Sequence, residues 1–383
     1  MSSTDRRAFL QAAGLAGMFS SVAPAALAQS AGMVAHEKAR TPEVAPKHSI
    51  RFGVIGLDHG HIYSMTAAVQ RGGGKLVAMY GSDPQQIADF RARFGDVKLA
   101  RSEDEIIEDR SIQLVVAAPI PDLRAALGVK VMRAGKDYLA DKPGIISLEQ
   151  LADVRRAVAE TGRRFAILYS ERLEVRSAVY AGELIRQGAI GRVIQTVNLA
   201  PHRTRLASRP AWFFDKARFG GILTDIGSHQ ADQFLFYTNS TEARVVAAQT
   251  GNLAHPDHPQ FEDFGDMVVA GNGGTGYVRV DWFTPDGLST WGDGRLFVLG
   301  TEGYIELRKY VNVASGLDGG NHLYIVDNKR ARYIDCNEVT LPFGSQFVTD
   351  IVERTQVAQD QKQALLAAEL VLSAQKNATR PLI

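Results

Sequence analysis

The sequence predicts an α/β protein with two domains: a doubly wound parallel sheet, then an α/β domain with a large open, mainly antiparallel sheet. From residue 49 to 170, short apolar runs alternate with helical patterns, which is typical of parallel sheets. From residue 171 to 383, strand-like segments follow one another with few helices between them. The chain has 383 residues, 45% of them hydrophobic, and about 150 residues per domain is usual.

The first domain begins with a buried-strand pattern at 49–56 that ends in glycine, followed by a helix at about 62–70. A second strand is predicted at 75–80, and Asp83 is a candidate N-cap for a helix that starts at Pro84. The remaining elements of this domain are strands at 112–118 and 137–140 and a helix at 123–133 that ends before Gly135.

The second domain is predicted from a series of short segments with strand character. These segments are 193–199, 244–250, 266–270, 276–283, 295–299 and 304–307, and two closing helices are predicted at about 345–353 and 360–376. Consecutive strands without helical crossovers indicate antiparallel pairing.

Charge and cysteine content exclude several classes of protein. Lys and Arg number 43 and Asp and Glu 42, so the net charge of +1 creates no field that would gather nucleic acid. Cys336 is the single cysteine, which excludes an internal disulfide and a cysteine-rich zinc site. The sequence thus favours a small-molecule partner and no nucleic acid.

The N-terminus resembles a twin-arginine export signal. Arg6 and Arg7 stand directly before an apolar, Gly- and Ala-rich run that extends to about Leu27, and Ala26-Leu27-Ala28 is a small-x-small cleavage site. We therefore expect a signal peptide at 1–28, a linker or arm at 29–48, and a mature protein in the periplasm without membrane association. A membrane anchor is the competing interpretation, but the run is short and only mildly hydrophobic.

The loop after the first strand is an incomplete dinucleotide-binding turn. In the pattern GxGxxG the three glycine places are held here by Gly56, Asp58 and His61, with Leu57, His59 and Gly60 between them. Three interpretations remain open: a pyrophosphate site, a metal site of Asp58, His59 and His61, or histidines that only pack or cap. An Asp at the second place sets a negative charge where phosphate would approach the helix.

The end of the second strand bears on the choice of dinucleotide. NAD-selective sites place Asp or Glu there to bind the ribose 2′-hydroxyl, whereas Tyr80-Gly81-Ser82 offers a small residue and a hydroxyl. Ser82 thus leaves room for a 2′-phosphate, and the sequence favours NADP over NAD.

Two further segments carry candidate catalytic groups. Asp141-Lys142-Pro143 follows a predicted strand, so Lys142 should lie at the carboxyl edge of the sheet, where ligands bind in open α/β folds. Asp225 and His229 stand four residues apart at a predicted helix start, where a carboxylate can orient an imidazole that accepts a hydroxyl proton. The structural alternatives are a surface lysine, an N-cap for Asp225 and a core histidine for His229.

The order of these motifs resembles the glucose-fructose oxidoreductase/inositol dehydrogenase family, Gfo/Idh/MocA. The resemblance covers about residues 50–383 and includes Asp141-Lys142-Pro143 and the Gly220-Gly221 to Asp232 segment. It implies a Rossmann domain, a C-terminal domain whose open sheet often mediates homo-oligomers such as dimers or tetramers, and oxidation of a sugar or polyol hydroxyl with a nicotinamide cofactor. Because glucose-fructose oxidoreductase is also exported and retains NADP, the resemblance implies a tightly bound cofactor.

The resemblance also assigns site residues. It implies Lys142, Asp225 and His229 as catalytic groups, with Pro119 and Asp141 beside the nicotinamide. Among candidate substrate contacts it favours Tyr169 and Arg172 first, then His202, Arg203 and Trp212 or Trp291. The departures from the family pattern are Asp58 and His61 for two glycines, Asp141 for a glutamate, and a loop at 118–123 without the usual Asn and His.

The leading hypothesis is thus a periplasmic sugar or polyol oxidoreductase that retains NADP in preference to NAD and holds no metal. Two alternatives stay open at this level. One is a glycoside hydrolase, lyase or epimerase that uses transient oxidation or redox-neutral acid/base chemistry. The other is a carbohydrate-binding protein without a cofactor.

Overall fold

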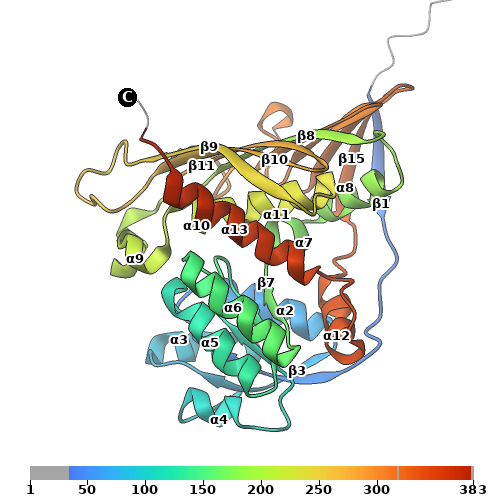
Figure 1. The fold of residues 1–383 in the computed structure, drawn as a ribbon. Helices are drawn as coiled ribbons and strands as arrows, with labels where there is room; N and C mark the ends of the chain where they lie inside the picture. The colour runs from blue at the N-terminus through green and yellow to red at the C-terminus, as the bar shows by residue number, and fades with distance from the viewer. Residues whose placement is uncertain (1–33, 317–318, 381–383) are drawn as a thin grey trace, which may run out of the picture. The chain divides into compact units, whose positions relative to one another are not determined.

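The structure is a computed structural model, and it describes residues 34–316 and 319–380. The predicted signal peptide at 1–28 and the first residues of the predicted arm lie outside the described residues. Two sheets form the framework, and Figure 1 shows the smaller one below the larger one. No helix in the described ranges is long and apolar enough to cross a membrane.

The smaller sheet has six parallel strands in the order β4-β3-β2-β5-β6-β7, which confirms the predicted doubly wound sheet. Its central strand β5 is buried along its whole length, as expected for a parallel sheet covered on both faces. The elements are β2 (Ile50–Ile55), α2 (His61–Arg71), β3 (Gly74–Tyr80), α3 (Pro84–Phe94), β4 (Lys98–Leu99), α4 (Glu103–Ile107), β5 (Leu114–Ala117), α5 (Pro121–Arg133), β6 (Asp137–Ala140), α6 (Leu148–Thr161) and β7 (Phe165–Ile167).

Local sequence signals explain several boundaries in this domain. Asp83 caps α3, since its carboxylate accepts hydrogen bonds from the backbone N–H groups of Gln85 and Gln86 at 2.7 and 3.1 Å. Pro84 occupies the first helical position, where its missing N–H costs nothing. Ser147 caps α6, which ends at Gly162 in the left-handed conformation.

The larger sheet has nine strands in the order β1-β15-β14-β13-β12-β8-β11-β10-β9. It is mainly antiparallel, and the β8–β11 and β1–β15 pairs are parallel. Its elements are β8 (Val193–Pro201), β9 (Ala243–Gly251), β10 (Phe264–Gly271), β11 (Gly274–Asp281), β12 (Arg295–Gly300), β13 (Gly303–Arg308), β14 (His322–Asp327), β15 (Ala331–Glu338) and β1 (Ala35–Arg40).

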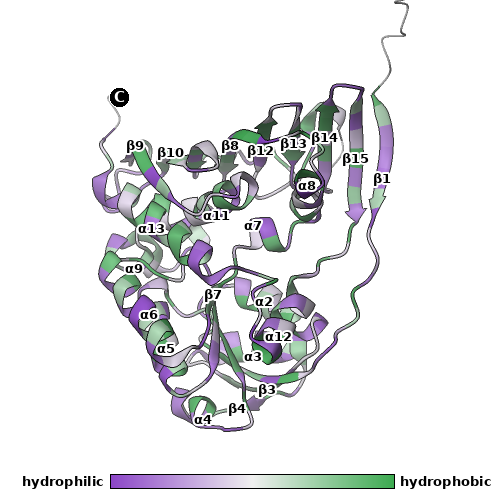
Figure 2. Cartoon of the chain, turned by 45° about the vertical axis from the view of Figure 1, so that its right-hand side comes forward, coloured by the Kyte–Doolittle hydropathy of each residue, from purple (hydrophilic) through white to green (hydrophobic). Residues whose placement is uncertain are grey.

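The predicted arm contains a strand. β1 pairs with β15 at one edge of the larger sheet, so part of the 29–48 segment is ordered. Strands β14 and β15, which the sequence analysis does not predict, separate β1 from the rest of the sheet. Figure 2 shows hydrophobic residues among hydrophilic ones along β15, whereas β1, with the sequence AHEKAR, is mostly hydrophilic.

Helices α8 (Arg176–Arg186), α10 (Ile222–Asp225), α11 (Gly227–Thr238) and α13 (Gln361–Asn377) contact strands of the larger sheet. The other helices and the short 3-10 segments of this part of the chain are α7 (Ser170–Leu173), η1 (Leu206–Ser208), η2 (Ala211–Phe214), α9 (Lys216–Phe219), η3 (Val313–Ser315) and α12 (Phe343–Glu353). Helix α11 packs on α13, β8 and β11. Its residues are almost all buried, so this helix is part of the core.

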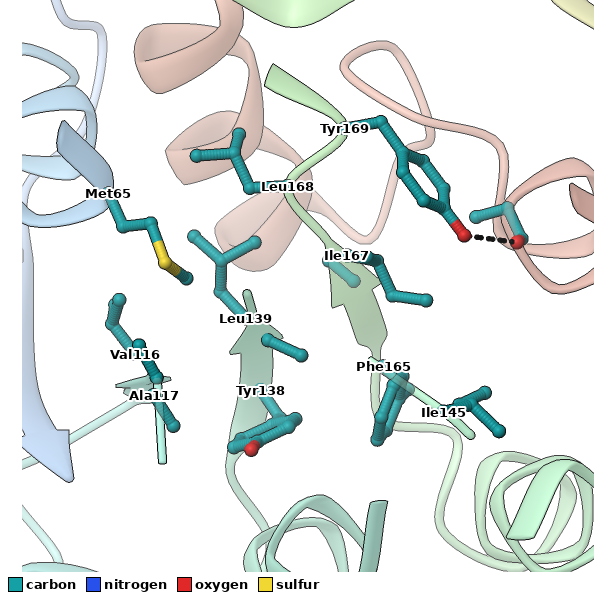
Figure 3. Packing of buried hydrophobic residues seen from close by; sticks show 14 of the residues in the cluster. Met65, Val116, Ala117, Tyr138, Leu139, Ile145, Phe165, Ile167, Leu168 and Tyr169 are labelled. Atoms are coloured by element: carbon teal, nitrogen blue, oxygen red, sulfur yellow. Dashed lines mark hydrogen bonds between the residues drawn. The ribbon is translucent and has the colours of Figure 1, made fainter. Parts of the chain in front are cut away.

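The end of the chain returns to the first domain. Helix α12 packs on α2, and a Cβ placed on Gly72 would lie 2.1 Å from the backbone of Gly344, so the two segments touch backbone to backbone. Buried side chains from both domains therefore form one apolar cluster. Figure 3 shows part of this cluster, in which Met65, Leu139 and Ile167 lie near one another.

Candidate active site

A cleft of about 280 Å³ lies where the carboxyl ends of the smaller sheet meet the second domain. It is lined by polar and aromatic side chains from both domains, and this cavity is called the cleft below. The lining residues are His59, His61, Pro121, Arg124, Lys142, Ser170, Glu171, His202, Arg203, Arg205, Arg209, Trp212, Phe213, Asp225, His229, Trp282, Trp291 and Tyr310.

Asp141, directly after β6, is the buried anchor on one side of the cleft. Its Oδ1 accepts hydrogen bonds from the backbone N–H of Lys142 at 2.7 Å and from His61 Nδ1 at 2.8 Å. Its Oδ2 lies 2.8 Å from His59 Nδ1 and 3.0 Å from Arg124 Nη2. Burial by itself would raise the pKa of Asp141, but the charge of Arg124 and the two histidines hold it well below its usual value.

The two loop histidines are therefore oriented by Asp141. A quarter of the His59 side chain is exposed. Its ring is nevertheless surrounded by protein, and this burial, together with the charge of His61, lowers the pKa of His59 to about 4. The metal interpretation combined Asp58 with these histidines, whereas the structure brings His59 and His61 together with Asp141 instead. Nδ1 of each histidine faces the carboxylate, so this trio is connected without an ion.

Lys142 and Asp225 form a buried ion pair in the cleft. Lys142 Nζ donates to Asp225 Oδ1 at 2.9 Å, and the two side chains are 7% and 13% exposed. Burial raises the pKa of Asp225, but the charge and hydrogen bond of Lys142, together with the nearby His59 and His202, outweigh burial, and the pKa falls below its ordinary value. Asp225 was expected to orient His229, but its carboxylate accepts its hydrogen bond from Lys142, and His229 Nδ1 has no partner among the described residues.

His229 sits in the first turn of α11 and is 3% exposed. Its Nδ1 has no hydrogen-bond partner among the described residues. Burial lowers the pKa of His229 to about 3, so the imidazole is neutral at physiological pH. Glu171, also in the cleft, opposes this shift by its negative charge.

The glycine loop fits a dinucleotide on two observations. Gly56 follows β2 with φ +78°, and a Cβ there would lie 2.7 Å from Pro119, so only glycine fits this turn. Helix α2 begins after Gly60 without a side-chain cap and without an acidic residue in its first turn, so the positive end of the helix faces the loop, although the Ile62 and Tyr63 N–H groups already donate to the His59 and Gly60 carbonyls at 3.1 and 3.4 Å. Asp58 is half-buried beside this site, and burial raises its pKa.

The end of β3 carries no free carboxylate at the predicted ribose position. Leu57 is buried, and a Cβ on Gly81 would lie 2.9 Å from it, so the chain passes close to the loop here. Ser82 is exposed directly after β3. Asp83, the next residue, uses its carboxylate to cap α3.

The structure places the predicted substrate residues in two groups. His202, Arg203 and Trp212 line the cleft, as does Trp291. Tyr169 and Arg172 do not line it, which corrects the expectation that they contact substrate first. The Tyr169 hydroxyl donates to the Ala364 carbonyl at 3.2 Å (Figure 3), and Arg172 is bound by Asp232 at 2.5 and 2.9 Å, because both side chains turn into the core beneath α11.

Several lining residues escaped the sequence analysis. Glu171 lies between the two residues that were singled out, and it accepts hydrogen bonds from Lys309 Nζ at 2.6 Å and Gln230 Nε2 at 3.0 Å. Arg124 looks like a solvated helix residue in sequence, yet it is 1% exposed. Trp282 and Tyr310 also belong to this group, and no spacing signal connects them with the first domain.

The fold and the cleft together define a two-domain Rossmann protein with a polar, partly charged site at the carboxyl edge of its parallel sheet. Sequence comparison gives the family. Residues 50–169 match the oxidoreductase family with an NAD-binding Rossmann fold, and residues 179–306 match the GFO/IDH/MocA C-terminal domain. The chain belongs to the Gfo/Idh/MocA family.

Known proteins share this architecture. The crystal structure of a putative oxidoreductase from Erwinia carotovora atroseptica is 48% identical, with a TM-score of 0.84, over 87% of this chain and 99% of that one. Levoglucosan dehydrogenase in complex with NADH shares the fold, with 19% identity and a TM-score of 0.71 over 86% and 98% of the two chains. A 1,5-anhydro-D-fructose reductase from Ensifer adhaerens is 26% identical over 230 residues, which are 58% of this chain and 65%, less than two thirds, of that relative.

Proposed function

We propose that this protein is a nicotinamide-dependent oxidoreductase that interconverts a CH–OH group of a sugar or polyol with the corresponding carbonyl. The family supports the redox class. Relatives named for 1,5-anhydro-D-fructose, and scyllo-inositol in Bacillus subtilis, support the substrate class. The observation that carries the proposal is the meeting of Lys142, Asp225 and His229 in one cleft beside the glycine loop.

The residues that would hold the cofactor are those of the loop and the adjoining strand ends. The start of α2, which has no side-chain cap and no acidic residue in its first turn and lies next to Gly56 and Gly60, suits the pyrophosphate through the positive end of the helix dipole. The exposed Ser82, with Asp83 occupied as a helix cap, favours NADP over NAD. When bound, the nicotinamide supplies the hydride acceptor for oxidation or the donor for reduction.

Different side chains of the cleft would transfer the proton and stabilise the charge on the reacting oxygen. His229 is neutral and buried, so it can accept the hydroxyl proton inside a site with little water. Lys142 Nζ, fixed by Asp225, is placed to stabilise the negative charge that develops on the reacting oxygen. Asp225 acts as a positioning residue for Lys142 in this scheme, and Glu171 supplies the negative charge that favours protonated His229.

The cellular setting completes the proposal. Export by the twin-arginine route after folding, with cleavage after Ala28, would deliver the protein to the periplasm with NADP retained. A homo-oligomer, dimer or tetramer, through the nine-stranded sheet is consistent with exposed Val246 and Val268 on the neighbouring strands β9 and β10, and with exposed Ile194 on β8, which β11 separates from β10. A retained cofactor would be regenerated by a second carbonyl substrate.

The test of the function is a substrate screen with matched variants. Purified protein with NADP or NAD and a panel of sugars and polyols is expected to form reduced nicotinamide, and His229→Ala to lower turnover by about 10² to 10⁴-fold. His229→Gln keeps the volume and guards against misfolding, and His36→Ala removes an exposed histidine of β1 as the control. Unchanged turnover in both His229 variants would remove this residue from the mechanism, and substrate conversion without net reduced nicotinamide would favour transient oxidation.

A further inference from the structure

The cleft holds more positive charge than its own carboxylates neutralise. Glu171 is paired with Lys309 at 2.6 Å, and Asp225 with Lys142 at 2.9 Å. Arg124, which lines the cleft, is paired with Asp141, which does not line it. Three further guanidinium groups line the cleft, all from the segment that follows β8: Arg203, Arg205 and Arg209.

Arg203 is used by the protein itself. Its Nη2 donates to the carbonyls of Pro285 and Leu288 at 2.9 and 2.5 Å, and its Nε lies 3.5 Å from the exposed Asp286. This side chain therefore ties two loops together at the wall of the cleft.

Arg209 is held in place but keeps binding capacity. Its Nε donates to the Thr204 carbonyl at 2.8 Å, and its guanidinium stacks over the rings of Phe213 at 4.3 Å and Trp282 at 5.0 Å. No carboxylate among the described residues lies within ion-pair distance of it. A half-buried guanidinium that is oriented by carbonyls and aromatic rings is prepared for an external oxyanion.

Arg205 adds a second cation at the same wall. Its backbone has φ +49°, a left-handed conformation that residues with a Cβ seldom adopt, and its side chain is exposed with no ion pair within the described ranges. Arg205 and Arg209 thus present two guanidiniums in the lining of the cleft, neither of which has an ion-pair partner among the described residues; the carboxylate that acts on Arg209 is Asp225, which is paired with Lys142.

An independent observation concerns Trp282. This residue is 5% exposed, and its Nε1–H, which can only donate, has no acceptor among the described residues. All three tryptophans of the chain, Trp212, Trp282 and Trp291, line the cleft. A buried indole donor without a partner next to Arg209 indicates that a ligand acceptor belongs there.

We propose that the substrate is a sugar derivative that carries an oxyanion, a carboxylate or a phosphate, bound by Arg209 and Arg205 with the ring against the tryptophan wall. This rests on the proposed function, since it names the substrate class of the same cleft. The anionic end then lies at the β8 side of the cleft, and the reacting CH–OH group lies toward Lys142 and His229 on the other lining segments.

The test measures binding separately from turnover. D-glucuronate, D-glucose 6-phosphate and D-glucose are titrated into the full-length protein by isothermal titration calorimetry, with tryptophan fluorescence as a reporter of the cleft. At least one of the two anions is expected to bind tenfold or more tightly than glucose, with an affinity that weakens as salt is added. Which anion binds more tightly distinguishes the carboxylate from the phosphate.

Arg209→Gln is expected to reduce the ratio of anion affinity to glucose affinity by about tenfold or more, with both affinities measured in the same variant. Arg205→Gln, at an exposed position that the fold does not need, is expected to weaken anion binding severalfold. Arg156→Gln is the control, because Arg156 lies on α6 outside the cleft lining and pairs with Asp153 at 3.4 Å.

Equal binding of all three ligands, no saturable binding of either anion, or loss in Arg156→Gln equal to that in Arg209→Gln would overturn the proposal. Displacement of both anions by saturating NADP would also overturn it, because the arginines would then serve cofactor phosphates. Anion binding without turnover would uphold this inference and contradict the proposed function. Turnover of neutral sugars alone, without preferential anion binding, would uphold the proposed function and contradict this inference.

Discussion

Replacing Asp225 by Asn tests the buried pair at the centre of the site. The change keeps the shape of the side chain and removes its charge, which leaves Lys142, 6% exposed, without an anion. Two unit charges 2.9 Å apart attract by about 6 kcal/mol at an effective dielectric constant of about 20, and desolvation offsets part of this. Removing one partner of a buried pair costs about 3–5 kcal/mol, so a loss of about 3 kcal/mol in the free energy of unfolding is expected.

The assay is urea unfolding followed by tryptophan fluorescence, together with initial rates. Lys142→Met and the double variant complete a cycle, in which the coupling free energy should be about 2–3 kcal/mol. Glu160→Gln is the control, since its pair with Arg133 is half exposed at 3.2 Å and should contribute less than about 1 kcal/mol. The folded-state pKa of Asp225 lies below the ordinary 3.8, so the pair's contribution is present above about pH 4 and is lost as pH falls through the folded pKa.

A coupling free energy near zero, or an Asp225→Asn variant as stable and active as Glu160→Gln, would refute this reasoning. The Lys142–Asp225 contact would then be a pair without energetic consequence. The orientation of Lys142 would need another cause.

Three further predictions follow from the same geometry. Because burial lowers the pKa of His229 to about 3, the imidazole stays neutral above about pH 4. A pH–rate profile of kcat/KM for oxidation should therefore show no fall on the acid side near pH 6.5, and a fall there would contradict the role of His229. Gly56→Ala should lower the free energy of unfolding by about 1–2 kcal/mol and weaken dinucleotide binding in equilibrium dialysis, because φ is +78° and a Cβ would press on Pro119. Gly60→Ala is the control, since a Cβ there would meet open space and stability should change little. Asp58→Asn should tighten NADP binding about two- to fivefold at low salt by removing a negative charge beside the helix start, and an unchanged Kd would mean that Asp58 faces away from the phosphates.

Local signals predicted most of the first domain. The cap at Asp83, Pro84 at the first helical position and the buried strand at 137–140 all occur as expected, because each depends on neighbouring residues. The edge strand β1 and its neighbour β15 were not predicted, since their charged residues mask any alternation and their pairing joins residues nearly 300 positions apart.

The site was predicted in part, for a related reason. Position in the fold brought Lys142, Asp225 and His229 into one cleft, but sequence spacing could not show that Lys142, from the other domain, is the partner of Asp225. Tyr169 and Arg172 turned into the core because Asp232 and the Ala364 carbonyl bind them there. Glu171, between them, points to the cleft, and no periodicity in a four-residue helix distinguishes the two directions.

The most direct measurement of the central account is nicotinamide turnover by the purified protein. Incubation with NADP or NAD and neutral and anionic sugars and polyols should yield reduced nicotinamide with at least one substrate, and the His229→Ala variant should lose that rate while still binding the dinucleotide. A protein that binds neither dinucleotide, releases none on denaturation and forms no reduced nicotinamide with any substrate would contradict the account.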